Sequence, residues 1–231
     1  MFERQLADAV RDLDAQADAP HTLQRLAEIT PEFFDLCDHV GISLVERDRI
    51  RTPVATDERL RKLDESQYEL GEGPCRAAIR EHETVIVHDL ATDPRWPSWG
   101  KVMVTELGIR SSLSFRLFTR PDRTWGALNV YSRTAHAFTQ EDVLQGHTVA
   151  AMAAVALARS MNDEQLASAL ETRTVIGQAV GMLMERYSLD EHRAFDVLRR
   201  VSSQDNTKLR DVAARLVRTR RLPERDEPEE D

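Results

Sequence analysis

The chain has 231 residues, of which 41% are hydrophobic and 31% charged, so its composition supports a buried core and excludes wholesale disorder. No run of about 18 apolar residues is present, and charged residues interrupt the N-terminal segment where a signal peptide would need an apolar centre. We therefore expect a cytoplasmic protein without a membrane span, folded as one large domain or two small ones.

The net charge of −9 is unevenly distributed along the chain. Residues 171–222 contain 11 Lys and Arg against 7 Asp and Glu, whereas the tail 223–231 contains one Arg and six acidic residues. A basic segment behind an acidic body favours a polyanionic partner, although an ordinary solvated helical surface gives the same count. The tail is expected to be disordered, and its charge makes it a candidate competitor for the basic segment.

The first two thirds of the chain predict a mixed domain. Residues 2–36 are expected to be helical with breaks near Pro20 and Pro31, and Pro53 argues that the strand containing it lies at a sheet edge. The elements expected next are strands at 39–46 and 50–56, a helix at 57–65, a Gly-Pro turn leading into a helix at 69–79, a strand at 84–87, an irregular loop at 88–99, and strands at 110–118 and 125–132. Adjacent hairpins predict an antiparallel sheet with helices packed on it, which is an α+β domain.

The pattern changes at Thr139. Thr139 and Asp142 have the spacing of a helix start, and no proline follows until Pro223. The stretch 140–186 is therefore predicted to form one helix of about 70 Å, typical of a coiled coil or dimer stalk. The alternative is two helices with a break near Asn162.

Two further helices are expected near the C-terminus. Ser188 and Glu191 form a capping box that predicts one helix start, and Asn206 is the expected N-cap of the next helix. Together with the end of the long helix, they predict a small three-helix bundle, whose apolar faces contain Ile176, Ala179, Leu183, Tyr187, Ala194, Leu198, Val201, Leu209, Val212, Ala213 and Leu216.

The string RTVIGQAVGMLMERYSLDEHRAFDVLRRVSSQDNTKLRDVAARLV (173–217) resembles the ANTAR family. The resemblance rests on agreement in spacing of Ala179, Gly181, Leu183, Met184, Ala194, Phe195, Leu198, Arg199, Ser202, Asn206, Leu209, Val212 and Ala213. It implies binding to tandem hairpins in nascent messenger RNA, usually as a dimer, and prevention of transcription termination. The chain departs from the family at Val180, where a basic residue is frequent, and this affects the expected RNA affinity or target choice.

The residue types in this segment are compatible with RNA binding. Arginine and lysine neutralise phosphates, and amide or hydroxyl side chains hydrogen-bond unpaired bases. Gly181 is expected to allow close approach of a backbone, either that of RNA or that of a packed helix. The candidate RNA-binding residues are Arg173, Gln178, Gly181, Arg199, Arg200, Ser202, Gln204, Asn206, Lys208 and Arg210.

The preceding region resembles a GAF domain of the kind found beside ANTAR modules in actinobacteria. The strings that carry the resemblance are LDESQYELGEGPCRAAI (63–79), VIVHDLATDPRWPSW (85–99), GIRSSLSFRLF (108–118), WGALNVYS (125–132) and AFTQED (137–142). It implies small-ligand sensing or dimerisation. The sequence identifies no cofactor and lacks the cyclic-nucleotide signature of some GAF domains. The side chains that could line a ligand pocket, or simply fill the core, are Tyr68, Cys75, His88, Trp96 and Trp99.

The interpretation as a whole is an α+β protein with an N-terminal antiparallel-sheet GAF-like domain with flanking helices, a long helical coiled-coil linker and a C-terminal three-helix ANTAR-like bundle. The expected boundaries are an N-terminal helix at 1–20, the GAF-like domain at 21–160, the linker with the ANTAR-like domain at 161–222, and the acidic tail at 223–231. The expected function is that of a non-enzymatic regulator that binds RNA, forms a homodimer and takes a small-molecule ligand.

Two alternative functions remain open from the sequence. Residues 190–217 can be interpreted as a DNA-binding helix-turn-helix, with the last helix entering the major groove. A thiol-dependent GAF-fold reductase is the other alternative, because Cys75 lies at a helix start that can lower a thiol pKa, with Cys37 as the other thiol. Two cysteines are too few for a structural zinc site.

Overall fold

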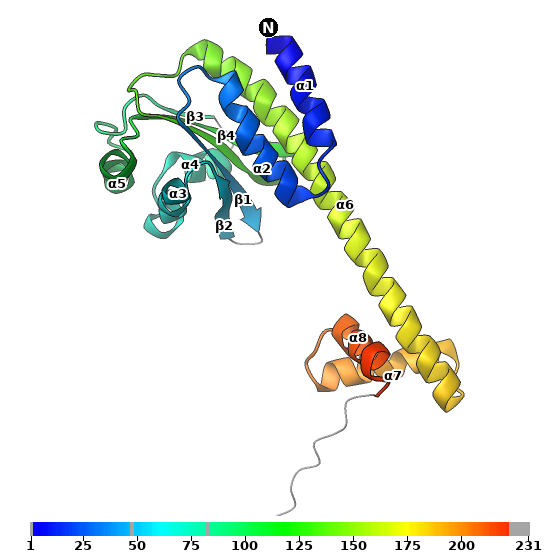
Figure 1. Cartoon of the computed structure of the whole chain (residues 1–231). Coiled ribbons are helices and arrows are strands. Elements are labelled where there is room, and N and C mark those ends of the chain that lie inside the picture. Colours follow the sequence, from blue (N-terminus) through cyan, green and yellow to red (C-terminus); the bar gives the residue numbers. More distant parts are fainter. Residues whose placement is uncertain (1, 47–48, 82–83, 222–231) are drawn as a thin grey trace, which may run out of the picture. The chain divides into compact units, whose positions relative to one another are not determined.

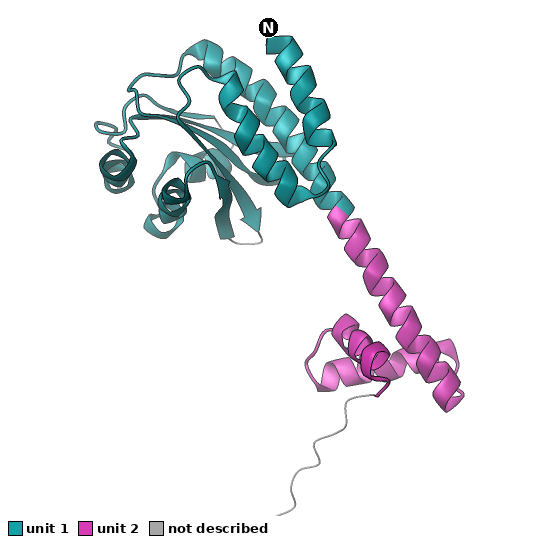
Figure 2. Cartoon of the chain, viewed as in Figure 1, with its two compact units in different colours: residues 1–163 teal, residues 164–231 magenta. Residues whose placement is uncertain are grey.

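A computed structural model describes residues 2–46, 49–81 and 84–221. The chain divides into two compact units, residues 1–163 and 164–231 (Figures 1 and 2). The long helix α6, Gln140–Tyr187, contributes residues to both units. The acidic tail 223–231 lies outside the described residues. In the part of the chain that is described, no helix is both long and apolar enough to cross a membrane.

The N-terminal unit is built on a five-stranded antiparallel sheet, which confirms the predicted α+β class. The strand order is β2-β1-β5-β4-β3. Pro53 lies in the edge strand β2, as predicted, where a missing backbone donor breaks no pairing within the sheet. The strands are β1 (His39–Glu46), β2 (Arg49–Ala55), β3 (Val85–Val87), β4 (Ser111–Arg120) and β5 (Arg123–Ser132).

One face of the sheet is apolar and is covered by α1 (Phe2–Asp14), α2 (Ala19–Ile29) and the first part of α6 (Figure 1). The predicted alternation in β4 is confirmed, since Leu113, Phe115 and Leu117 all point into this core. Helix α6 contributes alanines and Leu157 to the same core. Gly146 of α6 lies so close to the Phe115 ring that no larger side chain fits there.

The opposite face carries α3 (Glu58–Leu70), α4 (Pro74–Glu81) and α5 (Pro97–Leu107). The prediction of an irregular loop at 88–99 is wrong for its last residues, because α5 begins at Pro97. Pro97 suits the first turn of a helix, and Gly108 ends α5 in the left-handed conformation. Met103 and Leu107, four residues apart, bury the helix against the sheet with Trp99.

Helix α6 is continuous over 48 residues, which confirms the single-helix prediction and excludes the break near Asn162. Its start is capped reciprocally by the predicted pair. The Thr139 backbone N–H donates to Asp142 Oδ2 at 2.7 Å, and the Asp142 N–H donates to Thr139 Oγ1 at 3.3 Å.

The C-terminal unit packs the end of α6 against α7 (Glu191–Gln204) and α8 (Leu209–Thr219) around a small apolar core. Both predicted N-caps in this unit are wrong. Asp190 caps α7 by accepting a hydrogen bond from the Arg193 N–H at 2.8 Å, and Lys208 precedes α8 without a side-chain cap. Ser188 and Asn206 instead have φ values of 50° and 47° and form left-handed turns, whereas an N-cap needs an extended backbone.

Candidate functional site

The candidate RNA-binding residues of the C-terminal unit lie mostly at its surface. All of them are exposed except Ser202, which is half-buried. Arg199 and Arg200 lie on α7 beside a shallow cavity of about 490 Å³. Arg199 forms an ion pair with Asp196 at 2.9 Å, and such exposed pairs hold their partners weakly, so the guanidinium remains available to another anion.

The turn between α7 and α8 accounts for two of the polar candidates. Ser202 Oγ donates to the Thr207 carbonyl oxygen at 2.7 Å, and Asn206 supplies the left-handed residue of this turn. Gln204 is the last residue of α7, and Lys208 and Arg210 lie at the start of α8. The turn therefore places cationic and amide groups next to each other at one end of the bundle.

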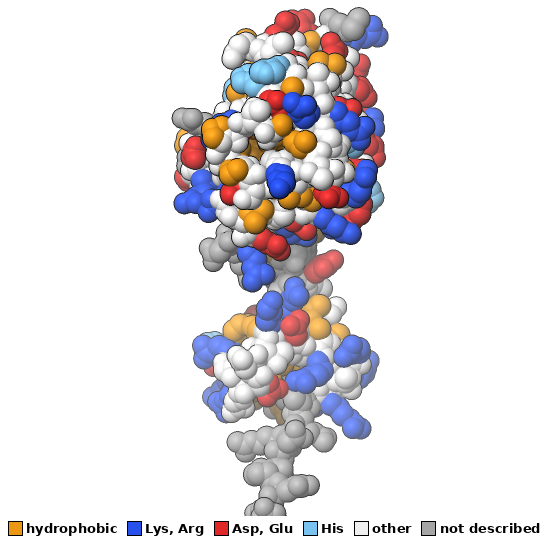
Figure 3. Space-filling view, turned by 90° about the vertical axis from the view of Figure 1, so that its left-hand side faces the viewer, with side chains coloured by type: hydrophobic (Ala, Val, Ile, Leu, Met, Phe, Trp, Pro, Cys, Tyr) orange, Lys and Arg blue, Asp and Glu red, His pale blue; other side chains and the backbone are white. Residues whose placement is uncertain are grey.

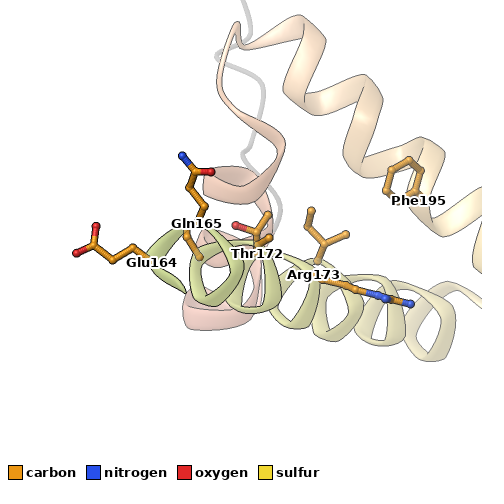
Figure 4. A pocket seen from close by; sticks show the side chains of 8 residues that line it. Glu164, Gln165, Thr172, Arg173 and Phe195 are labelled. Atoms are coloured by element: carbon orange, nitrogen blue, oxygen red, sulfur yellow. The ribbon is translucent and has the colours of Figure 1, made fainter. Parts of the chain in front are cut away.

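A groove lies between α6 and α7 within the C-terminal unit. It consists of two adjoining cavities of about 830 and 880 Å³, which share Arg173, Ile176 and Phe195. Figure 4 shows Phe195 reaching from α7 toward α6, where Thr172 and Arg173 lie. We call this feature the α6–α7 groove. Gly181 lines it, whereas Gln178 does not.

Phe195 lies beside the apolar face of α7. Its side chain is 37% exposed, because α7 buries Ala194 and Leu198 and leaves the neighbouring position at the groove. The amphipathic pattern of the sequence offers no apolar residue that would face Phe195, and this could have indicated that its side chain is exposed. Val180, the departure from the family pattern, is buried in the bundle core and lines the groove floor.

The structure does not bring the five candidate ligand residues of the N-terminal unit into one pocket. Tyr68 and Cys75 meet, with 3.6 Å between Tyr68 Oη and Cys75 Sγ. Trp99 is fully buried, and its indole N–H donates to the Leu63 carbonyl. Of the other two candidates, His88 is exposed and Trp96 is half-buried against the core beneath α5. His88 stacks on His136 with 5.6 Å between ring centroids, and Trp96 lies under the Arg95 guanidinium.

Tyr68 and Cys75 belong to a buried polar cluster centred on Asp64 of α3. Asp64 is fully buried, and its carboxylate accepts hydrogen bonds from both the sheet and α3. The donors are Tyr131 Oη at 2.6 Å, Thr52 Oγ1 at 3.0 Å, Asn129 Nδ2 at 3.3 Å, Ser43 Oγ at 3.4 Å and the Gln67 side-chain amide. The sequence pattern does not indicate this cluster, because an acidic residue in a charged helix is normally solvated.

Three polar atoms on strands β4 and β5 are buried and unpaired in the described part of the chain: Ser112 Oγ, Ser114 Oγ and Asn129 Oδ1. Ser114 and Asn129 are direct partners in the β4–β5 ladder. A buried polar atom without a hydrogen bond costs about 1–3 kcal/mol. The helix-covered polar face of the sheet therefore offers unused hydrogen-bonding capacity next to Asp64.

Burial controls the protonation of this cluster. It raises the pKa of Asp64 from 3.8 to about 6, and the surrounding hydrogen bonds limit the rise. Burial, with the nearby Asp64 charge, raises the pKa of Cys75 to about 12, and burial likewise raises the pKa of Cys37 to about 12. The expectation that the helix start lowers the Cys75 pKa is therefore wrong, because desolvation outweighs the helix dipole.

The raised pKa of Asp64 predicts a specific dependence of stability on pH. The folded protein keeps the Asp64 proton up to a pH of about 6, whereas the unfolded chain loses it near 4. This contribution to stability is complete below pH 4 and is lost as the pH rises to about 6, a change of about 3 kcal/mol. Urea denaturation at each pH should show it as a difference between the native protein and Asp64→Asn, in which this position does not titrate. Parallel profiles for the two proteins would show that Asp64 titrates normally.

Comparison with known families matches both units. Residues 16–158 match the GAF domain family, and residues 164–217 match the ANTAR domain family. No curated protein matches the chain.

Solved structures similar to the N-terminal unit share its fold at low sequence identity. A free methionine-R-sulfoxide reductase from Neisseria meningitidis, in complex with its substrate, is 20% identical with a TM-score of 0.56, covering 71% of this chain and 92% of that one. The GAF domain of an Acinetobacter phosphoenolpyruvate-protein phosphotransferase is 14% identical with a TM-score of 0.56, covering 71% and 98%. A GAF sensor protein from Burkholderia vietnamiensis is 13% identical with a TM-score of 0.56, covering 69% and 94%.

Proposed function

Since the chain belongs to the GAF domain family and carries an ANTAR domain behind it, we propose that it is a regulator that binds hairpin RNA and prevents termination of transcription. The ANTAR domain supplies the RNA-binding surface, and the GAF domain senses a small ligand. The protein acts in the cytoplasm, where nascent transcripts are available.

The charge of the C-terminal unit supports RNA as the partner. Several Lys and Arg side chains are visible on this unit in Figure 3, with fewer acidic ones between them. The excess of basic residues over 171–222 contrasts with the acidic remainder of the chain. Positive charge that is confined to one part of an acidic protein favours binding of a polyanion at that part over nonspecific binding of nucleic acid to the whole protein.

The test of this function is a salt titration of binding to a tandem-hairpin RNA, with a DNA duplex of equal length as competitor. We expect tight binding that weakens steeply with salt and that the duplex does not displace. Absence of salt-dependent binding by the full-length protein would contradict the proposal.

The DNA-binding alternative is not favoured by the arrangement of α8. This helix would have to enter the major groove, but it uses Val212, Ala213 and Leu216 to pack the bundle core. Its exposed side carries charges of both signs, including an ion pair between Arg210 and Asp211 at 3.2 Å. Displacement of hairpin RNA by duplex DNA in the same titration would revive this alternative.

The reductase alternative has no support in the geometry of the thiols. Cys75 and Cys37 pack in separate clusters of the N-terminal unit, and burial keeps both thiols protonated. A thiol reductase needs an accessible thiolate nucleophile. We therefore propose that the GAF domain is not catalytic.

We propose that the ligand of the GAF domain binds at the polar face of the sheet, around Asp64 and Asn129. The support is the buried hydrogen-bonding capacity at Ser112, Ser114 and Asn129, which a polar ligand would satisfy. Thermal unfolding in the presence of small polar metabolites tests this, because a ligand of this site raises the melting temperature of the native protein more than that of Asn129→Leu.

Homodimerisation is proposed through helix α6. Its exposed aliphatic residues larger than alanine include Leu144, Val155, Leu166 and Leu170, each more than half exposed. Leu144, Val155 and Leu166 recur every eleven residues, which is about three helical turns. An apolar row on the exposed side of a helix is stabilised by burial against a second copy.

The double substitution Leu166→Glu and Leu170→Glu should convert the dimer into a monomer, because it places four carboxylates in the interface of a symmetric pair. Light scattering should show the mass falling to that of a single chain. Leu70→Glu is the matched control, since Leu70 is an exposed leucine on α3 and its substitution should leave the mass unchanged. An unchanged mass for the double variant would exclude this interface.

A further inference from the structure

The positive charge of the C-terminal unit is concentrated at its last helix. Over residues 171–208, basic and acidic residues are equal in number, whereas residues 209–221 contain five arginines and one acidic residue, Asp211. The excess of positive charge over residues 171–222 therefore comes entirely from α8 and the turn that follows it. We call the arginines of this segment the α8 basic surface: Arg210, Arg215, Arg218, Arg220 and Arg221.

The α8 basic surface is available to an anionic partner. Helix α8 turns its apolar side to the bundle core, so its arginines lie at or near the surface. Arg210 pairs with Asp211 at 3.2 Å and Arg215 pairs with Asp205 at 3.1 Å, and exposed pairs of this kind are weak. The other three arginines are exposed, and their guanidinium groups form no ion pair with the residues that the structure describes.

A hydrogen-bonded turn closes the end of α8. Arg220 is left-handed, with a φ of 57°, and its backbone N–H donates to the Leu216 carbonyl oxygen. Arg186 of α6 donates to the Arg220 carbonyl oxygen at 2.7 Å, and Thr219 Oγ1 accepts a hydrogen bond from the Arg221 N–H at 3.2 Å. The chain therefore leaves α8 at a fixed place, directly beside the arginines of this turn.

The segment that follows this turn has the opposite charge. The acidic tail, residues 223–231, contains six acidic residues and one arginine. Nine residues reach about 30 Å when extended, whereas the 11 residues of α8 span about 16 Å. The acidic tail is therefore long enough to lie along the whole of α8, as far as Lys208 before its first turn.

We propose that the α8 basic surface is a docking site for the acidic tail of the same chain, and that the docked tail competes with RNA. The competition rests on the proposed RNA-binding function. Each carboxylate–arginine pair is weak by itself, but covalent attachment gives the tail an effective concentration in the millimolar range. RNA must displace the tail to reach Lys208 and Arg210, so the tail excludes RNAs that make few phosphate contacts.

Charge density and attachment favour the tail over the acidic N-terminal unit of a second copy as the occupant. Residues 1–170 contain 27 acidic and 19 basic residues, so their negative charge is diluted by positive charge. The tail instead concentrates six acidic residues within nine positions. A second copy must also be recruited from solution, whereas the tail is already present at α8.

The first experiment compares RNA binding by the native protein and by a full-length variant whose tail lacks its carboxylates. At about 50 mM salt the variant should bind the tandem-hairpin RNA about tenfold more tightly, and the difference should fall below about twofold near 0.5 M, because salt screens the tail from the arginines. The affinity of the native protein should accordingly fall less steeply with salt. The variant carries Glu224→Gln, Asp226→Asn, Glu227→Gln, Glu229→Gln, Glu230→Gln and Asp231→Asn.

A matched control removes the same number and types of acidic side chain from exposed positions of the N-terminal unit. Both variants change the net charge equally, so general attraction of RNA affects them alike. The control should gain much less affinity than the tail variant, and equal gains would overturn the tail as a competitor. The control carries Glu3→Gln, Glu32→Gln, Asp35→Asn, Glu69→Gln, Glu106→Gln and Asp122→Asn.

The second experiment detects the docked tail without RNA. Lys208 is the single lysine in residues 164–231, and it directly precedes α8. A carbodiimide joins a lysine to a carboxylate only where the two are in contact. Mass spectrometry of the native protein at low salt should therefore find Lys208 joined to an acidic residue of segment 229–231. The double substitution Arg210→Gln and Arg218→Gln should reduce this product several-fold, and a rise in salt should remove it.

The outcomes separate tail docking from the proposed function. Absence of the product between Lys208 and the tail, or equal RNA affinity of the native protein and the tail variant at low salt, would overturn the proposal. In a mixture of isotope-labelled and unlabelled protein, a product found only between two copies would overturn docking on the same chain. A product within one chain, together with absence of RNA binding by both proteins, would overturn the proposed function and the competition while supporting the docking.

Discussion

Replacing Arg199, Arg200 and Arg210 together by glutamine should reduce affinity for tandem-hairpin RNA about a hundredfold and flatten its salt dependence. Each of these exposed arginines can neutralise one phosphate and release its counterion, and loss of three contacts lowers the logarithmic salt slope by about two to three. The three guanidinium groups are exposed and at most weakly paired, so their removal should change the stability of the C-terminal unit little. Fluorescence anisotropy over a range of salt concentrations measures both quantities.

The matched control removes three arginines from the surface of the N-terminal unit. Arg4, Arg80 and Arg120 are exposed, and their replacement by glutamine changes the net charge by the same amount. We expect the control to bind RNA with nearly the native affinity and salt slope. Equal losses in the two triple variants would mean that overall charge, and not the ANTAR surface, determines binding.

Gly126→Val should unfold or severely destabilise the N-terminal unit. Gly126 of β5 pairs with Leu44 of β1, and a Cβ atom at this position would overlap the Ser43 carbonyl oxygen. The two strands must separate to accept a side chain, and we expect the free energy of unfolding to fall by about 3 kcal/mol. Because β1 also carries Ser43 into the polar cluster, the ligand site should be lost with the pairing.

The measurement is urea denaturation followed by tryptophan fluorescence. The three tryptophans, Trp96, Trp99 and Trp125, all lie in the N-terminal unit, so the signal reports this unit alone. Ala151→Val, an exposed position on α6, is the control that adds similar volume at the surface and should cost less than about 1 kcal/mol. If Gly126→Val unfolded at the same urea concentration as the native protein, β1 and β5 would be able to move apart without loss of stability, and the prediction would be wrong.

Local periodicity predicted the parts of the fold that depend on neighbours in sequence. The alternation of Leu113, Phe115 and Leu117 and the capping pair at Thr139 and Asp142 were sufficient for β4 and for the start of α6. The N-caps of α7 and α8 were each placed two residues too early, because Ser188 and Asn206 suit a cap and a left-handed turn equally well by type.

The buried cluster could not be predicted in this way. Asp64 meets Asn129 and Tyr131 across more than sixty residues of sequence, and only the sheet brings them together. In a charged helix, Asp64 has the local pattern of a solvated residue. The candidate ligand residues were chosen as large or reactive side chains, whereas the polar face is built from small hydroxyl and amide groups whose importance depends on burial.

Residues 162–171, in the middle of α6, are all exposed, so no other element shields their hydrogen bonds from water. Isolated helical stretches of this length are marginal in water and depend on a partner for stability. If the proposed dimer forms, amide hydrogen exchange in this stretch should be slower at protein concentrations that favour the dimer than after dilution to the monomer. In the proposed regulator, coupling between the GAF domain and the ANTAR domain would then depend on protein concentration, because the helix that connects them would be ordered only in the dimer.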